Sequence, residues 1–116
     1  MKEIKVDNLV TLHQGVIPNE GKPIYDQIKE ALDKKEEVSL DFAGIELMTT
    51  AFLNVAIGNL YKDYSSDFIK QYLKLQNVSV ENARRIKKVT DTAKLFYKDT
   101  ALFEKNIKPI LDGDIK

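Results

Sequence analysis

Between residues 38 and 42 the chain alternates apolar and polar side chains, which predicts a buried β-strand. Ala43-Gly44 breaks the alternation, and the following residues lead to a pair of threonines, Thr49 and Thr50. A threonine hydroxyl is a favoured N-cap because it accepts a hydrogen bond from a backbone N–H two or three residues later. The pattern therefore predicts a strand, a turn and a helix that begins at one of these threonines.

From Ala51 to Tyr64 the apolar residues recur with the period of a helix and cover most of its circumference. The sequence leaves only a narrow polar stripe, which consists of Asn54, Gly58 and Lys62. Such a helix must be largely covered by the rest of the protein. A glycine within it costs about 1 kcal/mol relative to alanine, unless another element packs closely against it.

The preceding part of the chain predicts a strand, a loop and a second helix. Residues 4–12 are typical of one bent strand or a tight hairpin, and residues 13–22 contain the glycines and proline of a loop. Pro23 suits the first position of a helix. The apolar face of that helix contains Ile24, Ile28, Ala31 and Leu32, and the helix should end within residues 33–37.

After the central unit the pattern predicts a loop at 65–67, a helical turn at 68–71 and a strand at 72–78. Ser79 is a good N-cap for a last long helix. One face of this helix carries Ala83, Ile86, Val89, Ala93 and Phe96, and a further short helix is expected within residues 100–111, broken by Pro109. Strands that alternate with helices predict an α/β domain with a mixed sheet of about four strands and helices packed on it.

Composition excludes several classes of protein. The 116 residues, enough for a single domain over 1–116, include 18 basic and 18 acidic side chains, so net charge points to no class of partner. There is no cysteine, which excludes disulfides and favours an intracellular protein. The first residues lack the apolar core of a signal peptide, and no stretch approaches the ~20 apolar residues of a membrane span. We expect a cytoplasmic protein without membrane contact.

Few residues suggest catalysis. His13 is the only histidine, so a site with several histidine ligands is impossible, and a solvated loop histidine is the simpler interpretation. The glycines form no phosphate-binding loop. Asp41 and Glu46 bracket the turn after the central strand, but nothing in the sequence fixes their separation, and Asp41 is expected to cap the turn or face solvent. We expect no enzyme activity, no metal and no cofactor.

The central unit resembles the STAS domain of sulfate transporters and anti-sigma factor antagonists, and more closely the bacterial STAS-like domains of unknown function. In the antagonists a strand ending in Asp-Phe-Ser-Gly precedes Asp-Ser-Ser-Gly-Leu, and these motifs align here with residues 41–44 and 49–53. Residues 73–86 resemble the later STAS strand and helix, and residues 89–96 the hydrophobic end that follows. Thr49 stands at the motif's aspartate and Phe52 at its glycine.

The resemblance implies a noncatalytic regulatory domain that binds a protein partner, most plausibly an ATPase of the histidine-kinase type. The antagonists are phosphorylated at the serine that aligns with Thr50, so the resemblance implies Thr50 as phospho-acceptor and Thr49 as cap and alternate acceptor. Helix capping alone also explains these threonines. The expected partner-binding residues are Glu46, Met48, Phe52 and Leu53, with Phe52 acting as an apolar anchor if it is exposed.

The alternative function is nucleic-acid association through the basic helix. Arg84, Arg85, Lys87 and Lys88 could contact phosphates. The chain is neutral overall and its aromatic residues do not interleave with these charges, so a solvated helix face is the simpler interpretation. The sequence does not determine the partner, the pathway or the oligomeric state.

Overall fold

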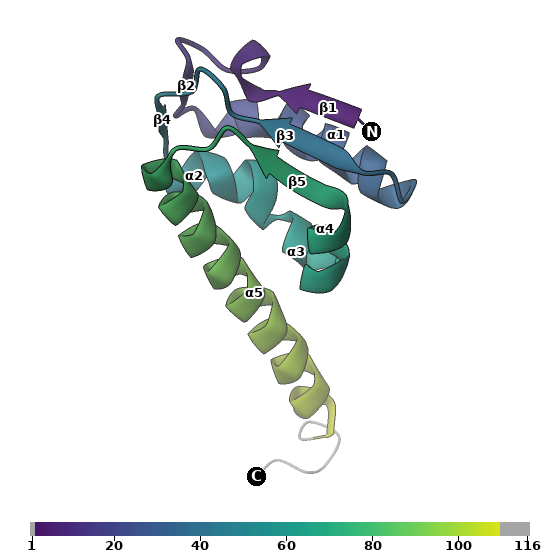
Figure 1. Cartoon of the computed structure of the whole chain (residues 1–116). Helices are drawn as coiled ribbons and strands as arrows, with labels where there is room; N and C mark the ends of the chain where they lie inside the picture. The colour runs from purple at the N-terminus through teal and green to yellow at the C-terminus, as the bar shows by residue number, and fades with distance from the viewer. Residues whose placement is uncertain (1, 110–116) are drawn as a thin grey trace.

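The main sheet contains three parallel strands in the order β1 (Lys2–Lys5), β3 (Val38–Asp41) and β5 (Leu73–Gln76). A second sheet pairs two short parallel strands, β2 (Gln14–Gly15) and β4 (Leu47–Met48). The computed structural model of the chain describes residues 2–109, with side chains described as far as residue 97 (Figure 1). The prediction of an α/β domain is confirmed.

The prediction of a mixed sheet of about four strands is wrong. The expected strand or hairpin at residues 4–12 ends at Lys5, where the chain enters a short 3-10 helix, η1 (Val6–Asn8). Leu12 and His13 then adopt left-handed backbone angles, with φ of 56° and 58°. These turns direct β2 along β4 instead of back along β1. Every strand pair in the described part of the chain is therefore parallel.

The first helix follows the predicted pattern closely. A 3-10 turn, η2 (Pro18–Glu20), leads into α1 (Gly21–Asp33), so Pro23 lies in its first turn and not at its first position. The buried residues of α1 include the whole predicted apolar face of Ile24, Ile28, Ala31 and Leu32. The helical spacing of these residues thus gave the correct core face.

The apolar helix expected from residue 51 to 64 is divided into three segments. These are α2 (Thr50–Leu53), a π-helical turn labelled η3 (Asn54–Gly58), and α3 (Leu60–Asp63). Gly58 is buried although the pattern placed it on the polar stripe. A Cβ there would lie 3.1 Å from Oδ1 of Asn54 and 3.4 Å from Cγ1 of Val89, so the last helix is in ordinary contact distance and does not by itself require glycine at this position.

The last elements are α4 (Ser66–Tyr72) and α5 (Val80–Pro109). Ser65 and Ser79 cap them, and the hydroxyl of Ser79 accepts a hydrogen bond from the Asn82 N–H at 3.1 Å, as predicted for Ser79. The structure places α5 as one continuous helix to Pro109, where the sequence predicted a break into two helices. Residues 110–111 of the expected short helix lie outside the described residues.

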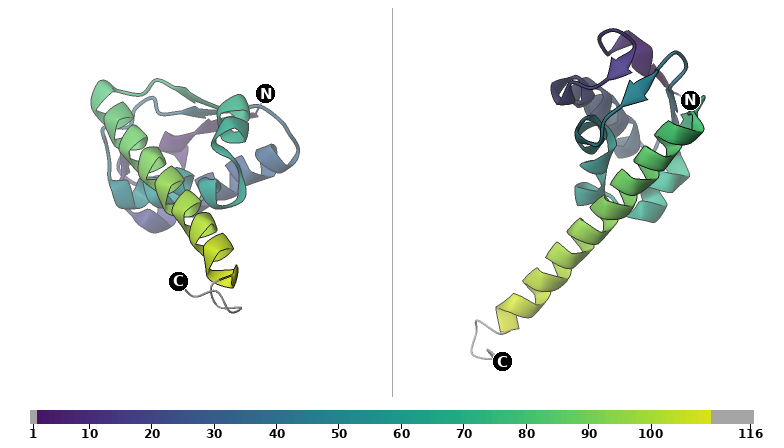
Figure 2. Two further views of the ribbon diagram at one scale, coloured as in Figure 1. Left: turned by 90° about the horizontal axis from the view of Figure 1, so that it is seen from below. Right: turned by 90° about the vertical axis from the view of Figure 1, so that its left-hand side faces the viewer.

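In the described part of the chain, the α-helices α1 to α5 lie on one side of the main sheet (Figure 1). Ile4, Val38 and Leu40 face the helices and are buried with the apolar faces of α1, α2 and α5. The opposite face carries polar residues, and there the buried Ser39 lies between Glu3 and Lys74 in the strand register. The far half of α5 extends beyond the other elements and gives the molecule its longest dimension of 56 Å (Figure 2).

Candidate functional site

The two threonines have different roles at the start of α2. Thr49 is the N-cap, since its hydroxyl oxygen accepts a hydrogen bond from the Phe52 N–H at 3.2 Å. The same hydroxyl lies 3.5 Å from the Gly15 carbonyl oxygen, to which it donates, and the Thr49 N–H donates to that carbonyl at 2.9 Å. Thr49 is therefore half-buried and fixed between β2 and α2, which confirms that a threonine caps this helix.

Thr50 is the first residue of α2 and is exposed to solvent. It lies where backbone N–H groups at the start of a helix have no carbonyl partner within the helix. Because Thr49 makes the capping bond, a change at the Thr50 hydroxyl leaves that bond intact. Thr50 is thus the more accessible of the two candidate phospho-acceptors.

Three of the four predicted partner-binding residues are in the core. No surface is exposed by Met48, Phe52 or Leu53, so the expectation that they contact a partner is wrong. Phe52 was expected to act as an apolar anchor only if it were exposed, and it is buried. Phe52 packs so closely under β2 that a Cβ on Gly15 would lie 2.8 Å from its ring. Glu46 alone is exposed among the four. The helix α2 is covered on the face that carries Phe52 and Leu53.

A different set of apolar residues is exposed near Thr50. We call it the β2–β4 patch, and it consists of Leu12, Val16, Ile17 and Leu47. Half of the large apolar side chains exposed by the described part of the chain belong to it. The patch flanks the two short strands, which lie side by side at the end of the molecule where α2 begins (Figure 2, right). Sequence reasoning missed these residues, although Val16 and Ile17, two apolar side chains within the predicted loop 13–22, were a usable signal.

Polar contacts hold the loop before β2 in place. His13 Nδ1 lies 2.7 Å from Asp7 Oδ1, and the Thr11 N–H donates to Glu20 Oε1 at 3.1 Å. The hydrogen bond to Asp7, and then the charge of Asp7, hold the pKa of His13 above its ordinary value. Between these contacts Leu12 is 78% exposed in a left-handed conformation, which is unusual for a bulky residue. Strain of this kind is found at functional loops.

The turn after β3 uses Asp41 as a structural acceptor. Its Oδ1 accepts hydrogen bonds from the Ala43 N–H at 2.9 Å and from Asn77 Nδ2 at 2.8 Å. These bonds, that from Asn77 first, hold the pKa of Asp41 below its ordinary value. The carboxylate thus joins the ends of β3 and β5, in agreement with the capping role expected for it.

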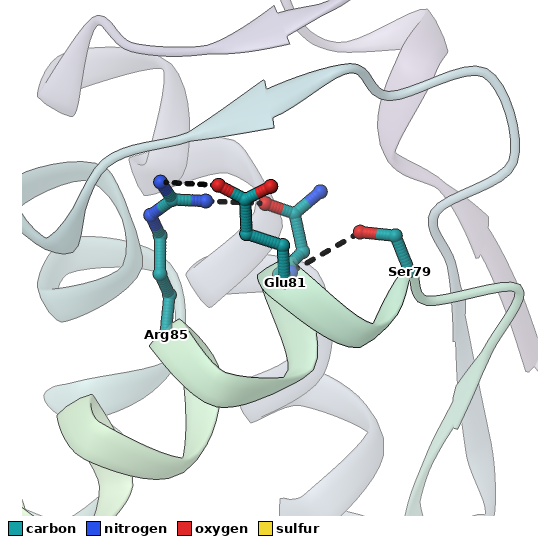
Figure 3. A network of polar contacts seen from close by, with 4 residues as sticks. Ser79, Glu81 and Arg85 are labelled. Carbon is teal, nitrogen blue, oxygen red and sulfur yellow. Dashed lines mark hydrogen bonds and ion pairs between the residues drawn. The ribbon is translucent and has the colours of Figure 1, made fainter.

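The basic residues of α5 are partly engaged within their own helix. Arg85 donates to Glu81 Oε1 at 3.2 Å and to Asn82 Oδ1 at 3.3 Å, beside the Ser79 cap (Figure 3). Lys87 donates to Asp91 Oδ2 at 2.8 Å. Arg84 and Lys88, the other two predicted phosphate contacts, are exposed. Nearby carboxylates reduce the positive field of this face, and nucleic-acid binding stays a prediction.

The described residues contain neither a cluster of metal ligands nor a helix that could span a membrane. No group of three or more histidine, cysteine, aspartate or glutamate side chains within this part of the chain is arranged to hold a metal ion. Among the same residues, every helix is too short or too polar to cross a membrane.

One comparison with known proteins identifies the family. The sequence model of a family described as a STAS-like domain of unknown function matches residues 20–83, more than half of the chain. The chain therefore belongs to this family of STAS-like domains. The matched segment runs from η2 to the first turn of α5 and contains both threonines. Searches of curated proteins and of solved structures each returned no match.

Proposed function

We propose that this STAS-like chain is a noncatalytic regulatory domain that binds a protein partner, in the manner of an anti-sigma factor antagonist. Its docking surface consists of the β2–β4 patch together with the exposed start of α2. Phosphorylation of Thr50 switches the docking. One observation supports this most directly: Thr50 is exposed three residues after Leu47 of the patch, while the Thr49 hydroxyl is engaged in the helix cap.

The charge introduced by phosphorylation explains the switch. A phosphothreonine adds about −1.5 to −2 charges, which are tolerated at the start of a helix, where partial positive charge gathers. A partner that covers Leu47 and Ile17 with apolar surface would have to desolvate these charges, and desolvation of a charge without a partner is costly. The unmodified domain therefore binds and the phosphorylated domain dissociates, while the fold stays intact.

The loop that carries Leu12 favours tight docking. Its contacts at His13 and Thr11 hold it in one conformation before a partner arrives. Binding then loses less conformational entropy than it would with a mobile loop. The partner should offer an apolar pocket for Leu12.

The phosphoryl donor has to come with the partner, because the sequence contains no phosphate-binding loop. An ATPase of the histidine-kinase type would supply both the docking site and the kinase activity. This partner class rests on the family resemblance.

The decisive experiment recovers the tagged protein with its bound partners, incubates the complex with ATP and maps phosphate by mass spectrometry. We expect phosphate at Thr50 in the wild type, and also in Thr49→Ala, which lacks the cap hydroxyl. We expect none in Thr50→Ala. Phosphate at Thr49 alone, or a complex that is unaffected by Thr50→Glu, would contradict the switch.

The docking surface is tested separately with exposed residues of matched chemistry. Leu12→Ser and Leu47→Ser should weaken partner binding by about tenfold or more each, because each removes an apolar contact worth more than about 1.4 kcal/mol. Leu95→Ser, an exposed leucine on α5, is the control and should leave binding unchanged. If the control weakens binding as much as the patch variants do, the docking surface lies elsewhere.

A further inference from the structure

The two edges of the main sheet are covered to different degrees. On the face toward the helices, the strand register places Ile4, Leu40 and Leu75 in one row across the sheet. Ile4 and Leu40 are 2% and 1% exposed, whereas Leu75 is 42% exposed. At the other edge α1 contacts β1. The apolar row is therefore closed at β1 and open at β5.

The backbone of β5 also has an open side. Within the described part of the chain, β5 pairs with β3 and with no other strand (Figure 1). The Phe42 N–H donates to the Gln76 carbonyl oxygen at 2.9 Å, so the backbone of Gln76 faces β3. Backbone groups of successive strand residues point to opposite sides, and the N–H and C=O of Leu75 therefore point away from the sheet. A further strand would bond to these groups.

A groove lies beside this open edge, between β5 and α5. It consists of two adjoining depressions of about 450 and 190 Å³, and both are lined by Leu75 and Ile86. We call it the β5–α5 groove. The other apolar side chains that line it are those of Ile57, Leu73, Val78 and Ala83. An edge strand with a groove beside it suits strand addition, in which main-chain hydrogen bonds supply affinity and the groove accepts alternate side chains.

The charges around the groove are mostly positive. Lys70, Lys87 and Lys94 line it, and among the described lining residues the only carboxylate is that of Asp91. Asp91 lies 2.8 Å from Lys87 and 3.9 Å from Lys94, so its charge is already compensated. Lys74, on β5 itself, is exposed on the opposite face of the sheet. An occupant with negative charge complements this edge on both faces.

The same charges argue against a second copy of the chain at this edge. Two copies paired through β5 would bring their groove lysines toward one another, and like charges across an interface oppose association. A lysine on an edge strand is also a common means of preventing pairing between copies, and Lys74 has this position. The occupant that fits is a segment of opposite charge from another protein.

The pleat of the sheet defines the pattern of that segment. In a strand added beside β5, the residue next to Leu75 directs its side chain to the same face, into the groove. The residues before and after it direct theirs to the face that carries Lys74. The groove favours apolar side chains at the first position, and Lys74 favours acidic side chains at the flanking positions.

We propose that the open edge of β5 binds an extended segment of a partner protein, in which apolar and acidic residues alternate, as a fourth strand of the main sheet. The apolar side chains contact Leu75 and Ile86 in the β5–α5 groove. The acidic side chains lie near Lys74, and the groove lysines attract the segment. This site is separate from the β2–β4 patch and does not depend on phosphorylation of Thr50.

The first test titrates the full chain into a fluorescently labelled heptapeptide, Glu-Val-Asp-Val-Glu-Val-Asp, and follows fluorescence anisotropy. We expect a dissociation constant below about 1 mM, and binding at least about tenfold weaker for Lys-Val-Lys-Val-Lys-Val-Lys. Leu75→Ser should weaken binding of the acidic peptide by about tenfold, because it removes the apolar contact. Lys74→Glu and Lys94→Glu should each weaken it by about fivefold.

Two matched controls separate the groove from general effects. Lys88 is an exposed lysine of α5 that does not line the groove. Lys88→Glu changes the net charge as much as Lys94→Glu does, and it should weaken binding by less than about twofold. Leu12→Ser, in the β2–β4 patch, should leave the affinity for the peptide unchanged.

The second test examines the backbone of β5 directly. Amide hydrogen exchange, measured by nuclear magnetic resonance with and without the acidic peptide, reports whether the Leu75 N–H becomes hydrogen-bonded. We expect exchange at Leu75 to slow by about tenfold or more in the complex. Methylation of the central valine nitrogen of the peptide removes one main-chain donor and should weaken binding. A peptide held by side chains alone would leave the exchange of Leu75 unchanged.

Several results would overturn the proposal. These are no binding of the acidic peptide at 1 mM or below on the scale given above, equal binding of the lysine peptide, an equal effect of Lys88→Glu and Lys94→Glu, and unchanged exchange at Leu75. A dimer in light scattering that Leu75→Ser dissociates would identify a second copy as the occupant instead. Circular dichroism on each variant separates loss of binding from loss of the fold. Leu12→Ser and Leu47→Ser test the other docking surface, so failure of either proposal is visible without the other.

Discussion

The helices α2 and α5 begin in the same way but present different surfaces. Each follows a parallel strand, and each is capped by a hydroxyl that accepts from the N–H three residues later, at 3.2 Å for Thr49 and 3.1 Å for Ser79. The two helices contact each other. What differs is the set of side chains around each cap.

At the start of α5 the polar side chains bind one another. Asn82 is buried, and Arg85 joins it to Glu81 (Figure 3). At the start of α2 the residue three after the cap is Phe52, which belongs to the core, while Thr50 and the β2–β4 patch face solvent. A capped helix start is therefore available to a partner only where neighbouring residues neither cover it nor form hydrogen bonds with its polar groups.

The largest expected effect on stability distinguishes Phe52 from Asn82, the residues three positions after the two caps. Phe52→Ala should lower the free energy of unfolding by about 3–5 kcal/mol, because it opens a cavity beneath β2. Asn82→Ala should cost about 1–3 kcal/mol through the lost hydrogen bond with Arg85. Urea denaturation followed by circular dichroism measures both. Equal losses would mean that the two helix starts depend on the same kind of packing.

The second prediction compares two glycines that approach these helices. Gly15→Ala should cost about 1–3 kcal/mol, because the new Cβ would lie 2.8 Å from the Phe52 ring. Gly58→Ala meets Asn54 Oδ1 at 3.1 Å and Val89 at 3.4 Å, and it gains helix propensity of about 0.5–1 kcal/mol. Its net effect should stay within about 1 kcal/mol of zero. Thermal unfolding of the two variants ranks them, and the opposite ranking would show that β2 moves away from α2 at little cost.

The third prediction concerns the caps. Thr49→Ala and Ser79→Ala should each cost about 0.5–2 kcal/mol, since each removes the acceptor for one N–H. Thr50→Ala, on the exposed neighbour, should change stability by no more than about 0.5 kcal/mol. Denaturant midpoints for the three variants test this. A loss at Thr50 as large as that at Thr49 would show that Thr50 has a structural role.

The smallest expected effect is the pH dependence of the loop beside α2. Asp7, aided by Glu46, raises the pKa of His13 above its ordinary value of 6.5. The contribution of the His13–Asp7 contact to stability is therefore complete below pH 6.5 and is lost as the pH rises through the higher pKa of His13 in the folded state. His13→Gln should remove this dependence, measured as urea midpoints from about pH 5 to pH 9. If the urea midpoints of the wild type and the variant change with pH in parallel, the contact between His13 and Asp7 does not form in solution.

The sequence predicted elements with a clear period well and misjudged those without one. The face of α1 around Ile24 and Ile28 was correct, as was the strand now seen as β3. The residues from Val6 to Leu12 carry apolar side chains without a decisive period, and there a turn through left-handed Leu12 replaced the expected strand. Local pattern does not show which of two possible strands a segment will pair with.

By itself, the sequence determined the helix start at the threonine pair, the core face of α1, the Ser79 cap and the family resemblance, because hydrophobic period and capping chemistry act over a few neighbouring residues. The tertiary structure decided which residues are available to a partner. It placed Phe52 and Met48 in the core, and it paired β2 with β4, which brings together the distant segments that carry the exposed Leu12 and Leu47. Burial depends on contacts between distant segments, and those contacts exist only once the strands have paired.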